Sequence, residues 1–190
     1  MNHRVGPGDP IEGRIHRAAG AKRLSDDIDF ISALGLFWPE LDLKRLLASL
    51  AIMDEPPPLL DSYSCFASNP ELGIELTFKN ADLLKVRFRD YPKRARVLHN
   101  IRFYGQATPD FSPYRGTLPF GLRFGMSRQS VVDLLGPPSW FSDDIGSMRW
   151  DAERHCLFAD LSKDSEVERV SVQTPVAESI RRSLADEERD

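Results

Sequence analysis

The motif that looks most reactive is a serine placed between a glycine and an amphipathic segment. Gly125-Met-Ser127-Arg-Gln129 begins like the strained elbow that presents the nucleophilic serine of α/β-hydrolases. The elbow needs a second glycine, where this chain has Gln129, and a preceding strand that the sequence does not convincingly supply. Serine directly before an amphipathic segment is a preferred helix cap. We therefore interpret Ser127 as a cap and not as a nucleophile.

The cysteines and histidines lack the spacing of a metal site. Cys65, His99, His155 and Cys156 are the ligand types of a Cys₂His₂ zinc centre, but no pair has CxxC or HxxxH spacing. His155 and Cys156 are adjacent, so on a strand their side chains point to opposite faces. A Cys–His protease is not supported either, since a local signature and an orienting Asn or Asp are missing. We predict a buried structural Cys156, a surface His155, and neither a metal nor another cofactor.

The acidic pairs and the glycine-rich segment also fit no catalytic pattern. Asp26-Asp27 and Asp143-Asp144 have no third carboxylate at metal-site spacing, so we expect solvated turns. Residues 6–13 (GPGDPIEG) lack the preceding strand and the Lys-Ser/Thr pair of a phosphate-binding loop. The sequence therefore predicts a protein that is not an enzyme.

Aromatic residues near turns suggest binding. Trp140-Phe141-Ser-Asp-Asp144 is predicted to be a loop in which aromatic side chains lie beside acids, and Tyr114 begins a Pro/Gly-rich approach to the helix capped by Ser127. Exposed aromatic residues are enriched among interface hot spots. We predict that a protein partner is bound by Tyr114, Arg115, Trp140, Phe141, Asp143 and Asp144.

Helical periodicity appears twice in the first half of the chain. Residues 25–34 (SDDIDFISAL) predict a helix capped by Ser25, with Ile28, Ile31 and Leu34 on one face. A second helix is predicted to begin after Asp42 as its cap. Its core-facing stripe is expected to comprise Leu43, Leu46, Leu47 and Leu50, and Pro56–Pro58 prevent its continuation.

Period-two patterns predict strands on both sides of a turn-rich connector at 105–113. In the strand over 97–104, Ile101 and Phe103 are expected to face one way, and Arg102 and Tyr104 the other. The expected strands are 63–67, 73–79, 83–88, 97–104, 147–150, 155–161 and 168–174.

Between the connector and the last three strands lies a third helix. Ser127 caps it, Val131, Leu134 and Leu135 form its apolar stripe, and Gly136 suits the left-handed residue that ends it. The prolines at 137 and 138 stop the helix.

The two halves share a pattern of a capped helix, prolines and then strands. We predict an α+β fold with two tandem helix-plus-antiparallel-sheet units, whose helices pack on one sheet face. The expected organisation is a disordered N-terminal arm (1–24), a first unit (25–105), a second unit (106–175) and a charged C-terminal tail (176–190).

Composition narrows the class of protein further. Of 190 residues, 41% are hydrophobic, which suffices for a core, and the net charge of −4 argues against nonspecific nucleic-acid binding. We expect no membrane span, because no 18-residue apolar stretch is present. Residues 1–24 contain no apolar run typical of a signal peptide. With two cysteines, the sequence predicts a cytoplasmic protein.

Residues 114–138 follow the pattern YxGxLPxGLxFxMSRxxVxxLLGxP. This pattern resembles small bacterial proteins that accompany polymorphic toxins as presumed immunity partners. Its core, FGMSRQSVVDLLG, is similar to the helix opening in β-lactamase-inhibitory proteins and in small outer-membrane assembly lipoproteins. The resemblance implies a helix-on-antiparallel-sheet unit, present in tandem in the inhibitory proteins. It also implies an immunity-type inhibitor that neutralises a cognate bacterial toxin by occluding it.

Two other functions are compatible with the sequence. One is a non-inhibitory adaptor or secretion chaperone that binds a protein partner. The other is an enzyme or small-ligand binder with a pocket between the units, lined by His99 and His155. The oligomeric state stays open, since an exposed edge strand could pair across a dimer.

Overall fold

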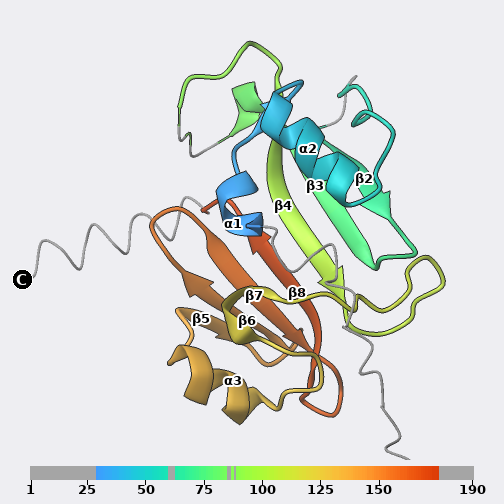
Figure 1. Cartoon of the computed structure of the whole chain (residues 1–190). Helices are drawn as coiled ribbons and strands as arrows, with labels where there is room; N and C mark the ends of the chain where they lie inside the picture. The colour runs from blue at the N-terminus through green and yellow to red at the C-terminus, as the bar shows by residue number, and fades with distance from the viewer. Residues whose placement is uncertain (1–28, 60–62, 85–86, 88, 176–190) are drawn as a thin grey trace, which may run out of the picture.

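The computed structural model describes residues 29–59, 63–84, 87 and 89–175, and within them the chain builds one antiparallel sheet of eight strands. The strand order is β2-β3-β4-β8-β7-β6-β5, and β1 pairs with one end of β4 (Figure 1). The strands are β1 (Phe37–Trp38), β2 (Ser64–Asn69), β3 (Ile74–Asn80), β4 (Arg96–Tyr104), β5 (Trp140–Ser142), β6 (Ser147–Asp151), β7 (Cys156–Leu161) and β8 (Val167–Gln173). The α+β class predicted from the sequence is confirmed.

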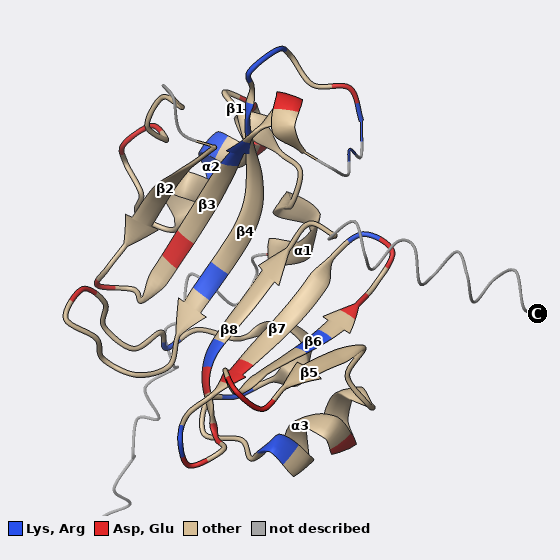
Figure 2. Ribbon diagram, turned by 180° about the vertical axis from the view of Figure 1, so that it is seen from behind, with Lys and Arg blue, Asp and Glu red and all other residues tan. Residues whose placement is uncertain are grey.

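Three α-helices accompany the sheet in this part of the chain: α1 (Phe30–Ala33), α2 (Leu41–Ser49) and α3 (Arg128–Leu135). Figures 1 and 2 place α1 and α2 on the same face of the sheet, and α3 at the end formed by β5 and β6. Short 3₁₀ helices span Ala81–Leu83 and Pro119–Gly121.

The core lies between the sheet and the face of α1 and α2 that meets it. In register, Leu76 of β3 is opposite Ile101 of β4, which is opposite Val172 of β8, and all three are fully buried. The ring of Phe30 in α1 packs edge-on against Phe103 at 5.0 Å between centroids. The alternation predicted for the end of β4 is confirmed, since Ile101 and Phe103 are buried while Arg102 and Tyr104 are half-buried.

The opposite face, which we name the open face, carries polar side chains. Glu75 and Arg102 form an ion pair at 3.0 Å, and Asp160 and Arg169 form another at 2.7 Å. Figure 2 shows these charged positions crossing the sheet from strand to strand. At one end of this face the residues before β4 fold over it, and Ala81 and Ala95 bury Val97.

The helix boundaries correct two predictions. Helix α1 begins at Phe30, where Asp29 accepts hydrogen bonds from the N–H groups of Ile31 and Ser32 at 3.1 Å each. The predicted cap Ser25 and the predicted face residue Ile28 lie outside the described residues. The predicted stripe is only partly correct: Leu34 is buried as expected, but Ile31 is partly exposed, and the helix buries Phe30 and Ala33 instead.

Helix α2 begins at Leu41 with Glu40 as its capping residue, two positions before the predicted Asp42. The Glu40 carboxylate accepts a hydrogen bond from Phe37 N–H at 2.9 Å, which fixes the approach to the helix. The predicted stripe is confirmed, since its four leucines are buried: Leu43, Leu46, Leu47 and Leu50.

Helix α3 confirms its predicted cap, because Ser127 Oγ accepts a hydrogen bond from Ser130 N–H at 3.2 Å. Gly136 ends the helix with a φ of 80°. The predicted stripe is only partly correct: Val131 is buried, but Leu134 is 46% exposed. In this eight-residue helix the face that meets the sheet is narrow, and Leu134 falls outside it.

Two strand predictions were wrong. In place of a strand over 83–88, the chain turns into the 3₁₀ helix Ala81–Leu83, whose first turn is held by Asn80 Oδ1 accepting Asp82 N–H. Residues 85, 86 and 88 lie outside the described residues. Trp140 and Phe141, predicted to lie in a loop, form β5 against β6. Strands of two or three residues are too short to show a period.

Candidate functional site

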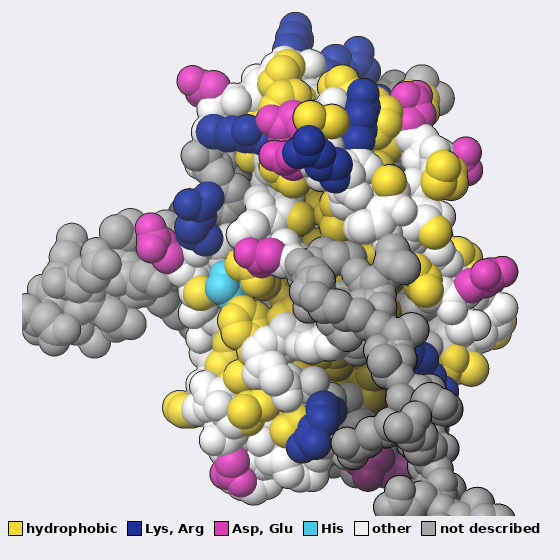
Figure 3. Space-filling model, viewed as in Figure 1, with side chains coloured by type: hydrophobic (Ala, Val, Ile, Leu, Met, Phe, Trp, Pro, Cys, Tyr) yellow, Lys and Arg dark blue, Asp and Glu magenta, His cyan; other side chains and the backbone are white. Residues whose placement is uncertain are grey.

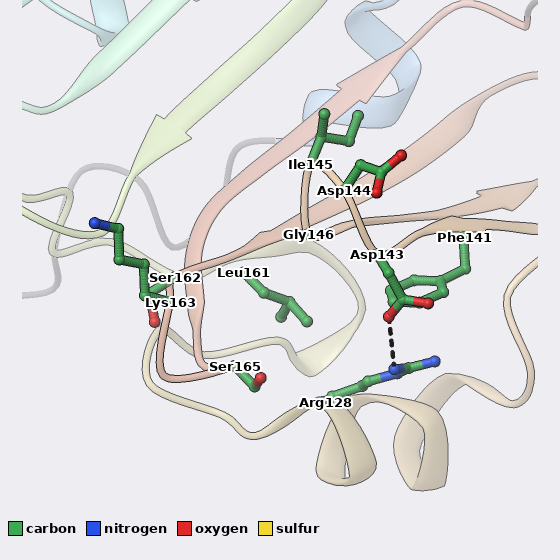
Figure 4. A pocket seen from close by; sticks show the side chains of 10 residues that line it. All are labelled: Arg128, Phe141, Asp143, Asp144, Ile145, Gly146, Leu161, Ser162, Lys163 and Ser165. Carbon is green, nitrogen blue, oxygen red and sulfur yellow. Dashed lines mark ion pairs between the residues drawn. The ribbon is translucent and has the colours of Figure 1, made fainter.

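A hollow of about 330 Å³ lies where the β5–β6 and β7–β8 turns meet the start of α3 (Figure 4). We name it the rim site. It is lined by Arg128, Phe141, Asp143, Asp144, Ile145, Gly146, Leu161, Ser162, Lys163 and Ser165.

The two turns of the rim site are tied to each other. Leu161 N–H donates to the Gly146 carbonyl at 2.7 Å. Gly146 has a φ of 59°, and a Cβ there would lie 3.0 Å from the Leu161 carbonyl oxygen, so glycine suits this position better than other residues. In the second turn, Ser162 Oγ accepts from the N–H groups of Asp164 and Glu166 at 3.2 and 3.4 Å. The hollow therefore has a fixed backbone frame.

On the α3 side of the rim site, Arg128 contacts both an aromatic ring and a carboxylate. The Arg128 guanidinium lies 3.7 Å from the centroid of the Phe141 ring and 3.6 Å from Asp143 Oδ1. The two charged side chains are 49% and 86% exposed, so solvent screens their attraction and the pair adds little stability. Stacking on the ring holds Arg128 in place over Phe141.

The remaining lining residues mix charge with apolar surface. In Figure 4, Lys163 lies on the side of the hollow opposite Asp143 and its side chain points outward, and Asp144 adds a second acid next to Asp143. Ile145 is 68% exposed at the tip of the β5–β6 turn, and Leu161, at the end of β7, is partly buried. Opposite charges around an exposed apolar side chain suit a protein surface better than a single small ion.

The lining residues offer contacts and not an obvious reaction. The set contains carboxylates, two cations and two serines, and it contains neither histidine nor cysteine. The hydroxyl of Ser162 is engaged by its own turn. In the part of the chain that the structure describes, no group of three or more His, Cys, Asp or Glu side chains could hold a metal ion.

The structure brings together half of the predicted binding residues. Phe141, Asp143 and Asp144 line the rim site. Trp140 projects from the opposite face of β5, where its ring centroid lies 5.7 Å from the Arg149 guanidinium. Arg115 is exposed but does not line this hollow.

Tyr114 takes a different place from the one expected. It is 5% exposed, and its ring lies 4.9 Å from that of Phe103 in the core. Its N–H donates to the Tyr104 carbonyl at 2.7 Å, which pins the connector to the end of β4. We therefore leave Tyr114 out of the binding surface.

Sequence reasoning missed Arg128, Ile145 and Lys163. Arg128 directly follows the Ser127 cap, and Ile145 directly follows the acidic pair, so both adjoin features that were noticed. Lys163 comes from the β7–β8 turn, and no sequence pattern connects it to the others.

The two histidines occupy separate environments. His99 on β4 shares a hydrogen bond with Thr174 Oγ1, and burial, helped by the charge of Lys79, lowers the pKa of His99 from 6.5 to about 4. His155 stacks on Phe120 at 5.3 Å, and burial lowers the pKa of His155. Neither histidine lines the rim site.

The two cysteines are both buried and lie in different parts of the sheet. Cys65 is on β2 and Cys156 on β7, with β3, β4 and β8 between those strands. The buried Cys156 predicted from the sequence is confirmed, whereas His155 beside it is partly buried rather than fully at the surface.

A buried ion pair lies on the open face near β5. Arg149 Nε and Asp151 Oδ1 are 2.9 Å apart, and the two side chains are 9% and 8% exposed. The Cys156 thiol donates to Asp151 Oδ1 at 3.1 Å. Within the described residues, Asp151 Oδ2 has no hydrogen-bond partner. The pair is therefore a tightly enclosed charged element of this half of the sheet.

Basic side chains gather at the other end of the molecule, around α2 (Figure 3). Several of them are engaged: Arg89 pairs with Glu40 at 2.6 Å, and Lys44 lies 5.2 Å from the centroid of the Trp38 ring. A second hollow of about 290 Å³ opens there beside Arg94 and Arg96. None of the predicted binding residues lines it, so the rim site is the better candidate.

Among the described helices, none has the length and apolar character needed to cross a membrane.

Comparison with known proteins adds one structural likeness. No family model matches the sequence, and no curated protein matches it. The chain is similar to the crystal structure of a DUF4309 family protein, YjgB, from Bacillus subtilis subsp. subtilis str. 168. The identity is 16%, the TM-score is 0.37, and the match covers 70% of this chain and 77% of the other. A likeness of this size does not define a common function.

Proposed function

We propose that this chain binds a protein partner and acts by occluding it, as an immunity-type inhibitor that neutralises a cognate bacterial toxin. The observation that carries the proposal is the rim site, whose lining includes both the exposed Ile145 and Arg128 stacked on Phe141. Arginine and aromatic side chains are enriched among interface hot spots, and a polar rim around an apolar contact is the usual anatomy of an interface.

Fixed ion pairs on the open face also support a protein partner. Arg102 with Glu75 and Arg169 with Asp160 are held in place across neighbouring strands before any partner arrives. Side chains that are ordered in advance lose less entropy on binding. Such a surface favours tight association with a rigid target.

A tandem arrangement of two units is part of the same proposal. Helix α2 precedes β2, β3 and β4, and helix α3 precedes β5 to β8. The two sets of strands adjoin through the antiparallel pair β4–β8. This order is what two side-by-side copies of one helix-and-strands unit would give. The toxin partner itself rests on the resemblance of residues 114–138.

Co-expression with the product of a neighbouring toxin gene tests the function. We expect rescue of growth and co-purification of the two proteins. The variant Ile145→Asp should weaken binding by at least about tenfold, because it places a charge at an apolar contact. Met53→Asp is the matched control, since Met53 is 85% exposed and remote from the rim-site lining.

The outcomes separate the candidate functions. Binding without loss of the partner's activity would favour the adaptor or secretion chaperone. Failure to rescue cells from any adjacent gene product would contradict the immunity proposal. Equal binding by the Ile145→Asp and Met53→Asp variants would show that the rim site is not part of the interface.

A further inference from the structure

The outer edge of β2 is unpaired among the described residues. β2 is the first strand in the sheet order, so one side of it has no partner strand among the described residues. Its sequence, Ser64-Cys-Phe-Ala-Ser-Asn69, contains neither charge nor proline. Edge strands are commonly protected by lysines, prolines, bulges or a covering element, because an unprotected edge is a template for another strand.

The register shows which backbone groups of β2 point outward. Asn80 N–H donates to the Tyr63 carbonyl, so Tyr63 directs its carbonyl group toward β3. Inward and outward residues alternate along an antiparallel strand. Ser64, Phe66 and Ser68 therefore direct their N–H and C=O groups away from the sheet, where another strand can pair with them.

The side chains of these three residues lie on the open face. Cys65 and Ala67 between them are buried in the core. Phe66 is 53% exposed, a large apolar side chain presented directly at the edge. The outward residues therefore combine unpaired backbone groups with an exposed aromatic ring.

We propose that a second copy of this chain pairs with β2, strand to strand and antiparallel. The run Ser64-x-Phe66-x-Ser68 is symmetric about Phe66, so a two-fold axis perpendicular to the sheet satisfies both copies at once. Phe66 then faces Phe66 of the second copy, and Ser64 faces Ser68 of the second copy. This register uses all three outward residues, and the absence of charge leaves no repulsion across the axis.

This dimer is independent of the toxin partner, and the isolated full-length chain tests it. Analytical ultracentrifugation of the wild-type chain should show a monomer–dimer equilibrium. Because Ser64 faces Ser68 across the axis, the variants Ser64→Glu/Ser68→Glu and Ser64→Lys/Ser68→Lys place like charges opposite each other. Each should raise the dissociation constant by at least about tenfold.

Charge exchange gives the decisive controls. The variant Ser64→Glu/Ser68→Lys places opposite charges across the axis and should dimerise within about threefold of the wild type. Within each copy it also places Glu opposite Lys79 and Lys opposite Glu75 on β3, so folding is favoured. An equimolar mixture of the Glu/Glu and Lys/Lys variants should form a heterodimer. Thermal unfolding of every variant confirms that it is folded.

Several outcomes would overturn the proposal. The wild-type chain could stay monomeric across the concentration range. The like-charge variants could dimerise as well as the wild type, which would place the interface elsewhere. Finally, the Glu/Glu and Lys/Lys variants could fail to associate while each remains folded, which would exclude the antiparallel register centred on Phe66.

Discussion

The two edge strands of the sheet differ in length and in protection. β2 has six residues without charge, whereas β5 has three, and the Arg128 guanidinium lies over its Phe141 ring. Asp143 and Asp144 follow β5 directly. Short strands and flanking charge discourage pairing with another strand. The β5 edge is therefore suited to binding through side chains, and the β2 edge to pairing through its backbone.

The largest expected effect on this half of the sheet comes from the buried ion pair between Arg149 and Asp151 on β6, the strand that pairs with β5. Arg149→Met should lower the free energy of unfolding by about 3 to 5 kcal/mol, because Asp151 would be left buried without its counter-charge. Urea unfolding followed by circular dichroism measures the change. The double variant Arg149→Met/Asp151→Asn should recover most of the loss. A double variant as unstable as the single one would show that packing, and not charge, explains the effect.

His99 on β4, midway between the edges, should make stability depend on pH. Its pKa is about 4 in the folded protein, against an ordinary value of 6.5, so between these values the unfolded chain takes up a proton that the folded chain does not. Above pH 6.5 the histidine contributes nothing, and as the pH falls toward 4 stability should decrease by on the order of 3 kcal/mol.

Urea unfolding of wild type and His99→Gln at pH 7 and pH 4.5 measures this contribution. The variant should lose less stability on acidification than the wild type, since glutamine does not titrate. Equal losses in the two proteins would mean that other groups, and not His99, determine the acid sensitivity.

The smallest expected effect is at the β5 edge itself. Arg128→Ala should cost roughly 0.5 to 1 kcal/mol, the usual range for a cation over an aromatic ring at the surface. Arg45→Ala on α2 is the control, since Arg45 contacts Asp42 at 3.0 Å with both side chains about 70% exposed. Thermal unfolding compares the two variants. A loss no larger than that of the control would show that Arg128 does not stabilise the edge.

Much of the sheet could be predicted because burial imposes a period on it. β3, β4 and β8 share one buried face, so Ile101 and Phe103 on β4, and likewise Val170 and Val172 on β8, are two positions apart. Ser127 was predictable for a local reason, since a cap and its helix are contiguous. β1 and β5 were missed because two or three residues show no period, and Tyr114 because its burial depends on Phe103 in a different element.

The rim site was predictable only where it is contiguous in the chain. Phe141, Asp143 and Asp144 belong to one strand and its turn, and their types suggested binding. Arg128 and Lys163 join them because α3 and the β7–β8 turn meet at the same end of the sheet. That meeting depends on the strand order, which no short-range pattern encodes.

The antiparallel pair β4–β8 also constrains the order in which the parts of the sheet can fold. Arg96–Tyr104 is synthesised well before the strand that pairs with it, Val167–Gln173, which is near the end of the described chain. The hairpins β2–β3 and β6–β7 are local and can form first. The two halves of the sheet can join only when β8 is available to pair with β4. Until then, Ile101 and Phe103 lie on a temporary edge strand, and unpaired strand edges of this kind are prone to aggregation.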